Sequence, residues 1–158
     1  SFVISEKSIG CDGVLRFYAN NESVCDHPFE EAFIRHCRWT PSAARPYVVN
    51  ADPGLADRLY DEEHTIKGVT LTAVGFYGPQ GRVLRLPLAM PGINDRITAF
   101  RYEGYKVTNY EMESAAITGL CNLLGHRAAT ICLINGNASA DYHIYLQKLI
   151  RYTLEKLS

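Results

Sequence analysis

The 158-residue sequence contains no apolar run long enough to cross a membrane, and no segment resembles a signal peptide. It also lacks an excess of either charge, because 16 basic residues stand against 17 acidic ones and no basic block occurs. A chain with these features is not expected to bind nucleic acid or a membrane surface. Internal repeats and low-complexity segments are absent too.

The five cysteines show no paired spacing. There is no Cys-x-x-Cys motif, and an odd number argues against a full disulfide framework. Cys121 and Cys132 lie in apolar sequence and are expected to be small core residues. Cys25-Asp26-His27 could suggest a metal site or a nucleophile, but no second ligand pair stands at metal spacing, so we expect no metal. The expected location is the reducing cytoplasm.

An apolar content of 47% excludes a disordered chain, and the length suffices for one domain with a sizeable core. Strand-like and helix-like segments alternate. This order predicts an α/β fold with three layers, in which helices cover both faces of a mixed central sheet. Extended segments are expected at residues 2–5, 45–50, 68–74, 105–108 and 128–134, and helices after Pro28, from Ala115 to Leu124 with Gly125 as C-terminal cap, and over residues 142–154.

Two further segments are predicted to be irregular. Residues 13–21 are expected to form a loop, with Arg16, Phe17 and Tyr18 near a site or a subunit contact. Residues 87–94 contain the turn signal Pro91-Gly92 and are expected to form a flexible flap.

The segment Asn109–Ala115 places Glu111, Met112 and Glu113 at the junction between a strand and a helix. Side chains at such a junction are held by rigid backbone and face the cleft where α/β sheets bind ligands. Two carboxylates beside a thioether suit a neutral, hydroxyl-bearing ligand, because carboxylates accept hydrogen bonds from a diol and sulfur packs on a ring face. The alternative is an ordinary helix N-terminus, where glutamates are favoured by the helix dipole.

The segment Gly75–Arg82 follows the strand-like residues 68–74 and contains Gly-Pro-Gln-Gly, which predicts a strand that enters a turn. Gln80 and Arg82 together offer donors and an acceptor that match the edge of a pyrimidine, and Phe76 offers a surface for ring packing. The alternative is a surface loop with a solvated arginine.

These two segments resemble the uridine phosphorylase branch of the nucleoside phosphorylase family, which shares Phe-Tyr-x-x-Gln-x-Arg and Asn-Tyr-Glu-Met-Glu-Ser. The resemblance implies that Gln80 and Arg82 bind uracil and that Phe76 packs in the nucleoside pocket. It also implies that Met112 and Glu113 hold the ribose, with Glu111 matching the first glutamate of the motif. Glu-Met-Glu occurs in purine phosphorylases and related nucleosidases too, whereas the Gln-x-Arg loop separates the uridine branch from them.

The resemblance carries further expectations. The family uses inorganic phosphate as co-substrate and no other cofactor, and its members are homo-oligomers, either dimers or hexamers. Purine enzymes carry an aspartate where this chain has Gly136, which disfavours purine chemistry. Uridine enzymes usually carry Asn-Arg where this chain has Asn137-Ala138, so that arginine is missing.

Family members are longer, and their N-terminal part carries the phosphate-binding residues. Residues 1–158 are therefore expected to be the C-terminal part of a single nucleoside phosphorylase-like domain, with the N-terminal part of the fold absent from this chain. On this interpretation the chain supplies the base and ribose subsites, and by itself it is not expected to catalyse phosphorolysis. The alternatives are a non-catalytic nucleoside-binding or assembly module of the same fold, and a purine phosphorylase or nucleosidase relative.

Overall fold

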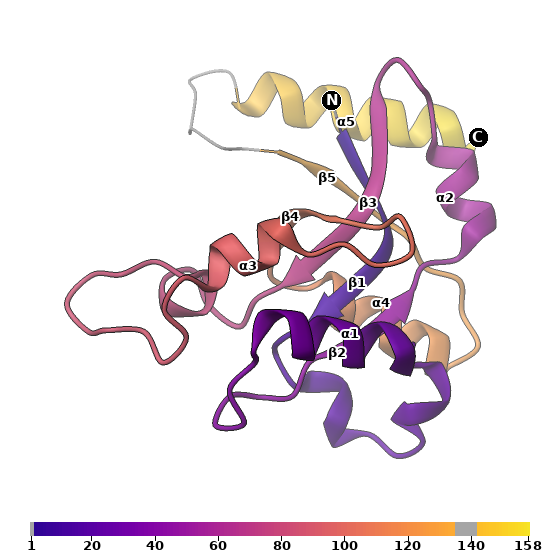
Figure 1. Ribbon diagram of the computed structural model, residues 1–158. Helices are drawn as coiled ribbons and strands as arrows, with labels where there is room; N and C mark the ends of the chain where they lie inside the picture. The colour runs from indigo at the N-terminus through magenta and orange to yellow at the C-terminus, as the bar shows by residue number, and fades with distance from the viewer. Residues whose placement is uncertain (1, 135–141) are drawn as a thin grey trace.

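The computed structural model describes residues 2–134 and 142–158, in which five strands and five α-helices alternate (Figure 1). The strands are β1 (Phe2–Gly10), β2 (Tyr47–Asn50), β3 (Thr65–Thr72), β4 (Val107–Glu111) and β5 (Thr130–Leu133). The α-helices are α1 (His27–Cys37), α2 (Pro53–Leu59), α3 (Ile93–Ala99), α4 (Ser114–Leu123) and α5 (Tyr142–Leu157). Three short 3₁₀ helices are η1 (Val14–Phe17), η2 (Asn21–Val24) and η3 (Gly78–Gln80).

The sheet is mixed, as predicted. Its order is β2-β1-β3-β4, and β5 also pairs with β1. Strands β1, β3 and β4 run parallel to one another. The other edge of β1 is shared, because its first half pairs antiparallel with β5 and its second half pairs antiparallel with β2. The parallel pairing of β3 with β4 aligns Thr72 with Glu111, so the segments that follow these two strands leave the sheet at the same edge.

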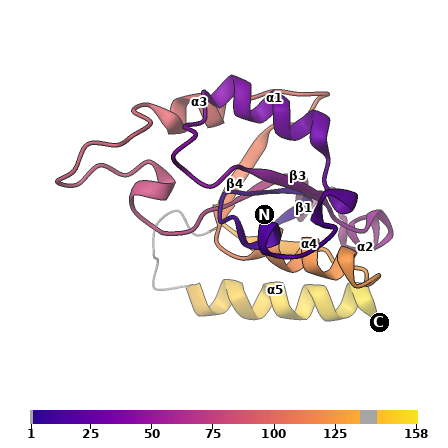
Figure 2. The ribbon, with the colours of Figure 1, turned by 90° about the horizontal axis from the view of Figure 1, so that it is seen from below.

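Helices cover both faces of the sheet, which confirms the three-layer α/β/α architecture. Helices α1 and α3 lie on one face, and α4 and α5 lie on the other (Figure 2). On the first face the rings of Phe29, Phe33 and Phe100 pack edge to face with centroids 5.3–5.4 Å apart. On the second face Leu15 and Tyr47 are buried together with residues of α4. No helix within residues 2–134 and 142–158 is both long and apolar enough to span a membrane.

Local sequence signals explain where several helices begin and end. The carboxylates of Asp26 and Asp52 accept hydrogen bonds from the first turns of α1 and α2, and each helix has a proline in its first turn. Gly125 follows α4 with a φ of +73°, which is the left-handed conformation predicted for a residue that ends a helix.

Four predictions differ from the structure. Strand β1 continues to Gly10 instead of ending at Ser5, because it pairs with β3 along its whole length. Residues 13–21 contain η1 and the start of η2. In the region 87–94, residues 87–92 are irregular with a turn at Pro91-Gly92, as predicted, but residues 93 and 94 already belong to α3, because the buried side chains of Ile93 and Ile97 anchor that helix to the core. The deeply buried cysteines are Cys11 and Cys37, whereas Cys121 and Cys132 are only partly buried.

Candidate functional site

A cavity of about 720 Å³ lies where the segments after β3 and β4 leave the sheet. All six residues that the sequence assigned to the base and ribose subsites line it: Phe76, Gln80, Arg82, Glu111, Met112 and Glu113. Residues of β5 and of the first half of α5 complete the lining, including Thr130, Cys132, Leu146 and Leu149. Sequence reasoning did not assign these residues to a site, because they follow the Glu111–Glu113 motif by about twenty residues or more and reach the cavity only through the tertiary arrangement of β5 and α5.

The loop after β3 holds three of these side chains next to one another. The guanidinium carbon of Arg82 lies 4.1 Å from the ring centroid of Phe76, which is the geometry of a cation–π contact. The Nη2 group of Arg82 donates a long hydrogen bond to Oε1 of Gln80, with 3.5 Å between the nitrogen and the oxygen. Gln80 is almost buried, with 8% of its surface exposed, whereas Phe76 is 52% exposed. The loop therefore presents a ring face, an amide and a planar cation as one group.

The carboxylate of Glu111 is already engaged within the protein. Its Oε2 accepts hydrogen bonds from the backbone N–H groups of Glu113 and Ser114, each at 2.6 Å, and its Oε1 accepts one from the hydroxyl of Thr72. The Thr72 oxygen in turn accepts a hydrogen bond from the N–H of Ala115 at 2.9 Å. Glu111 and Thr72 thus satisfy three N–H groups at the start of α4, which would otherwise lack partners.

The next two side chains of the motif remain available to a ligand. Met112 is 41% exposed, and the Glu113 side chain is exposed and makes no hydrogen bond within residues 2–134 and 142–158. Two polar atoms in the cavity wall are buried without a hydrogen-bond partner in the same part of the chain, Nδ2 of Asn109 and Oγ of Ser114. No sequence signal marked these two atoms, since both belong to residue types common at strand and helix ends.

Cys132 is one of the residues that line this cavity. Burial, followed by the nearby carboxylate of Glu111, raises the pKa of the Cys132 thiol. A thiol with a raised pKa stays protonated near neutral pH and is a poor nucleophile. The site therefore offers hydrogen bonds and ring contacts to a ligand and does not present Cys132 as an activated nucleophile.

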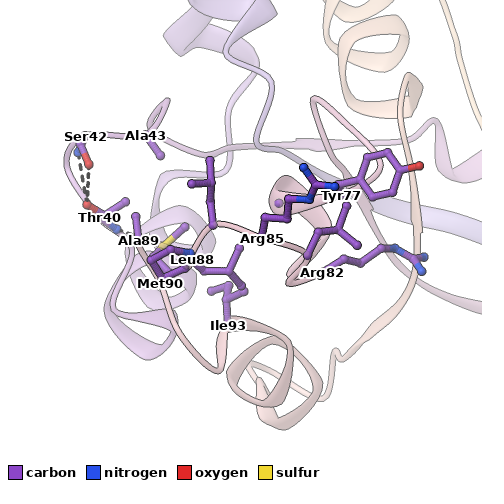
Figure 3. Close-up of a pocket in the computed structure, with 14 residues that line it drawn as sticks. Thr40, Ser42, Ala43, Tyr77, Arg82, Arg85, Leu88, Ala89, Met90 and Ile93 are labelled. Carbon is purple, nitrogen blue, oxygen red and sulfur yellow. Dashed lines mark hydrogen bonds between the residues drawn. The ribbon is translucent and has the colours of Figure 1, made fainter.

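A second cavity, of about 880 Å³, is lined in part by Tyr77 and Gly78 of the same loop (Figure 3). Aliphatic side chains from residues 84–93 form much of its wall, and Thr40 and Ser42 lie at the end opposite Tyr77. Arg82 lines both cavities, but its guanidinium points away from Leu88 and Ile93. Phe76 and Gln80 line the first cavity and not the second.

A family model described as the phosphorylase superfamily matches residues 1–148. The chain belongs to the phosphorylase superfamily. Two curated relatives are both from Schistosoma mansoni. Uridine phosphorylase A is 35% identical over 88 residues, and inactive uridine phosphorylase B is 34% identical over 96 residues. Each match covers 54% of this chain and 29% of the relative.

Solved structures support the same superfamily fold. A Trypanosoma brucei nucleoside phosphorylase, described as showing uridine phosphorylase activity, superposes with a TM-score of 0.81 at 22% identity. The uridine phosphorylase of Schistosoma mansoni in its apo form superposes with a TM-score of 0.59 at 21% identity. Each comparison covers 99% of this chain, which spans 57% and 53% of the two solved chains, respectively. The predictions made for Gly136, Asn137 and Ala138 concern residues outside the part of the chain that the structure describes.

Proposed function

We propose that this chain supplies the base and ribose subsites of a pyrimidine nucleoside phosphorylase. The reaction would convert a uridine-like nucleoside and inorganic phosphate into the free base and ribose 1-phosphate. The observation that carries the proposal is that the Gln80–Arg82 loop and the Met112–Glu113 junction line one cavity. The similarity to uridine phosphorylase A supports a pyrimidine as the base.

The base subsite is assigned to Phe76, Gln80 and Arg82. When the glycosidic bond breaks, negative charge develops on the departing pyrimidine. Donors from Gln80 and Arg82 would stabilise this charge, and their hydrogen bonds strengthen as the charge grows. The stacking of Arg82 on Phe76 supports this role, because it holds the planar guanidinium in one orientation before the base arrives.

The ribose subsite is assigned to Met112 and Glu113, with Glu111 behind them. The exposed Glu113 carboxylate would accept hydrogen bonds from the ribose hydroxyls, and Met112 would pack on the sugar. Glu111 would contribute by fixing the start of α4, from which Glu113 projects. Phosphate is itself the nucleophile, so no side chain needs that role, and no cofactor other than phosphate as co-substrate is proposed.

The proposal extends to the protein that contains this chain. We take residues 1–158 as the C-terminal part of one phosphorylase-like domain, acting in a cytoplasmic homo-oligomer, a dimer or a hexamer. These three expectations remain predictions. The test of the activity is release of uracil from uridine by the purified protein in the presence and absence of phosphate. Faster cleavage of inosine than of uridine would contradict the pyrimidine assignment.

A second candidate is a non-catalytic nucleoside-binding module. It is favoured by the 34% identity to a relative named inactive uridine phosphorylase B. The two candidates differ in one measurement: a binding module takes up uridine and releases no uracil when phosphate is added, whereas a phosphorylase releases uracil only with phosphate.

Loss of the Arg82 side chain is expected to weaken uridine binding by about 2 kcal/mol, because a hydrogen bond to a charged group contributes roughly 1.5–3 kcal/mol. Gln80→Ala should weaken it by about 1 kcal/mol, as expected for a neutral hydrogen bond. Isothermal titration of the 158-residue chain with uridine measures both effects. Arg101→Ala is the matched control, because Arg101 is an exposed arginine whose hydrogen bonds within the described part of the chain go to the nearby carbonyls of Thr98 and Phe100. Equal losses in Arg82→Ala and Arg101→Ala would refute the base assignment.

The Glu113→Gln variant is expected to bind uridine more weakly by roughly 1.5–3 kcal/mol while its affinity for free uracil stays unchanged. The reason is that a carboxylate loses its charge-assisted bonds to the ribose hydroxyls, and uracil has no ribose. Parallel titrations with uridine and uracil make this comparison. If Glu113→Gln bound uridine as tightly as the unmodified chain does, the ribose assignment would be wrong.

A further inference from the structure

One amide group connects the two halves of the cavity. The Nδ2 group of Asn94, in α3, donates a hydrogen bond to the backbone oxygen of Gln80 at 2.9 Å. On its other side, Oδ1 of Asn94 accepts a hydrogen bond from the hydroxyl of Tyr110 at 2.7 Å. Tyr110 lies in β4 and directly precedes Glu111. A single side chain thus joins the loop of residues 75–82, the base loop, to the strand that leads into residues 111–113, the ribose motif.

Among the described residues, the bond from Asn94 is the hydrogen bond that joins the base loop, residues 75–82, to another element. Its internal backbone bonds run from the N–H groups of Gln80 and Arg82 to the oxygen of Tyr77, both at 3.0 Å, and from the N–H of Gly81 to the oxygen of Gly78 at 2.9 Å. These bonds shape the turn without attaching it to the sheet. Gly81 has a φ of +72°, and a Cβ atom there would lie 2.6 Å from the side-chain amide of Asn94. The amide therefore packs directly against the backbone of the turn.

The helix that carries Asn94 is itself firmly held. Ile93 and Ile97 are only 4% and 3% exposed in the core. The Nε group of Arg96 donates a hydrogen bond to the backbone oxygen of Cys37, the last residue of α1, at 2.7 Å. Tyr110 is held by the pairing of β4 with β3, and burial raises the pKa of its hydroxyl, which therefore stays protonated as a donor. Asn94 and Tyr110 therefore belong to elements that are anchored to the core, and the base loop is bonded to both through Asn94.

We infer that Asn94 and Tyr110 are positioning residues that set the base specificity of the site by holding Gln80 and Arg82 at a fixed place relative to the ribose motif. This inference rests on the proposed role of Gln80 and Arg82 in binding a pyrimidine. Recognition of the uracil edge needs donors and acceptors at defined positions, and a loop released from Asn94 would still carry these groups but would present them in many arrangements.

The test compares base selectivity and loop protection in matched variants of the 158-residue chain. Asn94→Ala should lower the ratio of uracil affinity to cytosine affinity about tenfold. Tyr110→Phe, which deletes one oxygen atom, should lower this ratio about threefold. Both values follow from the small net free energy that a single hydrogen bond contributes. Amide hydrogen exchange at residues 80–82 should become about tenfold faster in Asn94→Ala. Nuclear magnetic resonance measures both quantities on one labelled sample.

Two controls remove the same kinds of bond elsewhere. Asn122→Ala deletes an Asn side-chain bond to the backbone oxygen of Asn50, and Tyr152→Phe deletes a hydroxyl bond to the backbone oxygen of Leu59. Both controls should leave base selectivity and exchange at residues 80–82 unchanged. A general loss of stability would lower uracil and cytosine affinity together and would not alter their ratio.

The outcomes separate this inference from the proposed function. If the unmodified chain binds uracil and neither Asn94→Ala nor Tyr110→Phe changes the uracil-to-cytosine ratio, the inference is overturned and the proposed function stands. If the unmodified chain binds no uracil, the proposed base subsite fails. Amide exchange at residues 80–82 then decides whether Asn94 holds the loop. Faster exchange in Asn94→Ala supports this positioning role, and unchanged exchange overturns it. Should Asn94→Ala fail to fold, Tyr110→Phe gives the same readouts.

Discussion

Glu111→Ala is expected to lower the free energy of unfolding by about 3 kcal/mol. The substitution removes an acceptor of three hydrogen bonds and leaves two N–H groups at the start of α4 and the Thr72 hydroxyl without that partner. Loss of a helix cap costs roughly 0.5–2 kcal/mol, and each unsatisfied buried group adds about 1–3 kcal/mol, partly offset by water that reaches this half-buried position. Urea denaturation of the 158-residue chain measures the change.

The neighbouring glutamate is the control. Glu113→Ala should change the free energy of unfolding by no more than about 0.5 kcal/mol, because the Glu113 side chain is exposed and forms no hydrogen bond within the described residues. The two glutamates of one motif are thus expected to have different effects: substitution of Glu111 changes mainly the stability of the fold, and substitution of Glu113 changes mainly the affinity for uridine. Equal destabilisation by both substitutions would show that the Glu111 contacts do not cap α4.

Gly10→Ala is expected to destabilise the fold by about 3 kcal/mol, near the upper end of the usual cost of overpacking. Gly10 pairs with Tyr47 across β1 and β2, and a Cβ atom at residue 10 would lie 2.2 Å from the Tyr47 ring. The ring cannot easily move, because it is fully buried and its hydroxyl donates a hydrogen bond to the carboxylate of Asp12 at 2.8 Å. A chain of this size should then melt roughly 6–12 °C lower.

Gly78→Ala provides the comparison for this prediction. The nearest atom to a Cβ at residue 78 is a methyl group of Leu88 at 3.8 Å, which is an ordinary contact. Differential scanning calorimetry of both variants should therefore give a large decrease in melting temperature for Gly10→Ala and little change for Gly78→Ala. For a chain of this size, each kcal/mol of destabilisation lowers the melting temperature by roughly 2–4 °C. If Gly10→Ala melted within about 2 °C of the unmodified chain, the result would show that β1 and β2 can separate to admit the methyl group.

Features that depend on neighbours in sequence could be predicted. The apolar spacing after Glu113 and the glycine at residue 125 indicated α4 and its end, and both are present. The Gly-Pro-Gln-Gly turn after a β-branched run indicated the loop that holds Gln80 and Arg82. The fold class followed from the alternation of such segments. In each case the information lies within a few residues of the element that it specifies.

Short elements with mixed signals were predicted less well. Helix α3 has only seven residues and directly follows Pro91-Gly92, so a turn signal concealed a helix that is stabilised by burial. The second half of β1 begins with polar residues, which suggested that the strand had ended. Its pairing with β2 and β3 keeps it extended, and neither pairing is visible in the local sequence.

The sequence by itself determined the residue types of the site: an aromatic ring, Gln80 and Arg82 after one strand, and the Glu-Met-Glu motif after another. Only the tertiary structure decided how they are used. The parallel register of β3 and β4 brings Thr72 to Glu111, which assigns that carboxylate to the start of α4 and leaves Glu113 exposed to the cavity. The packing of α3 places Asn94 between Gln80 and Tyr110. These hydrogen bonds join residues far apart in the chain, so strand pairing and helix packing, which the residues alone do not display, fix their partners.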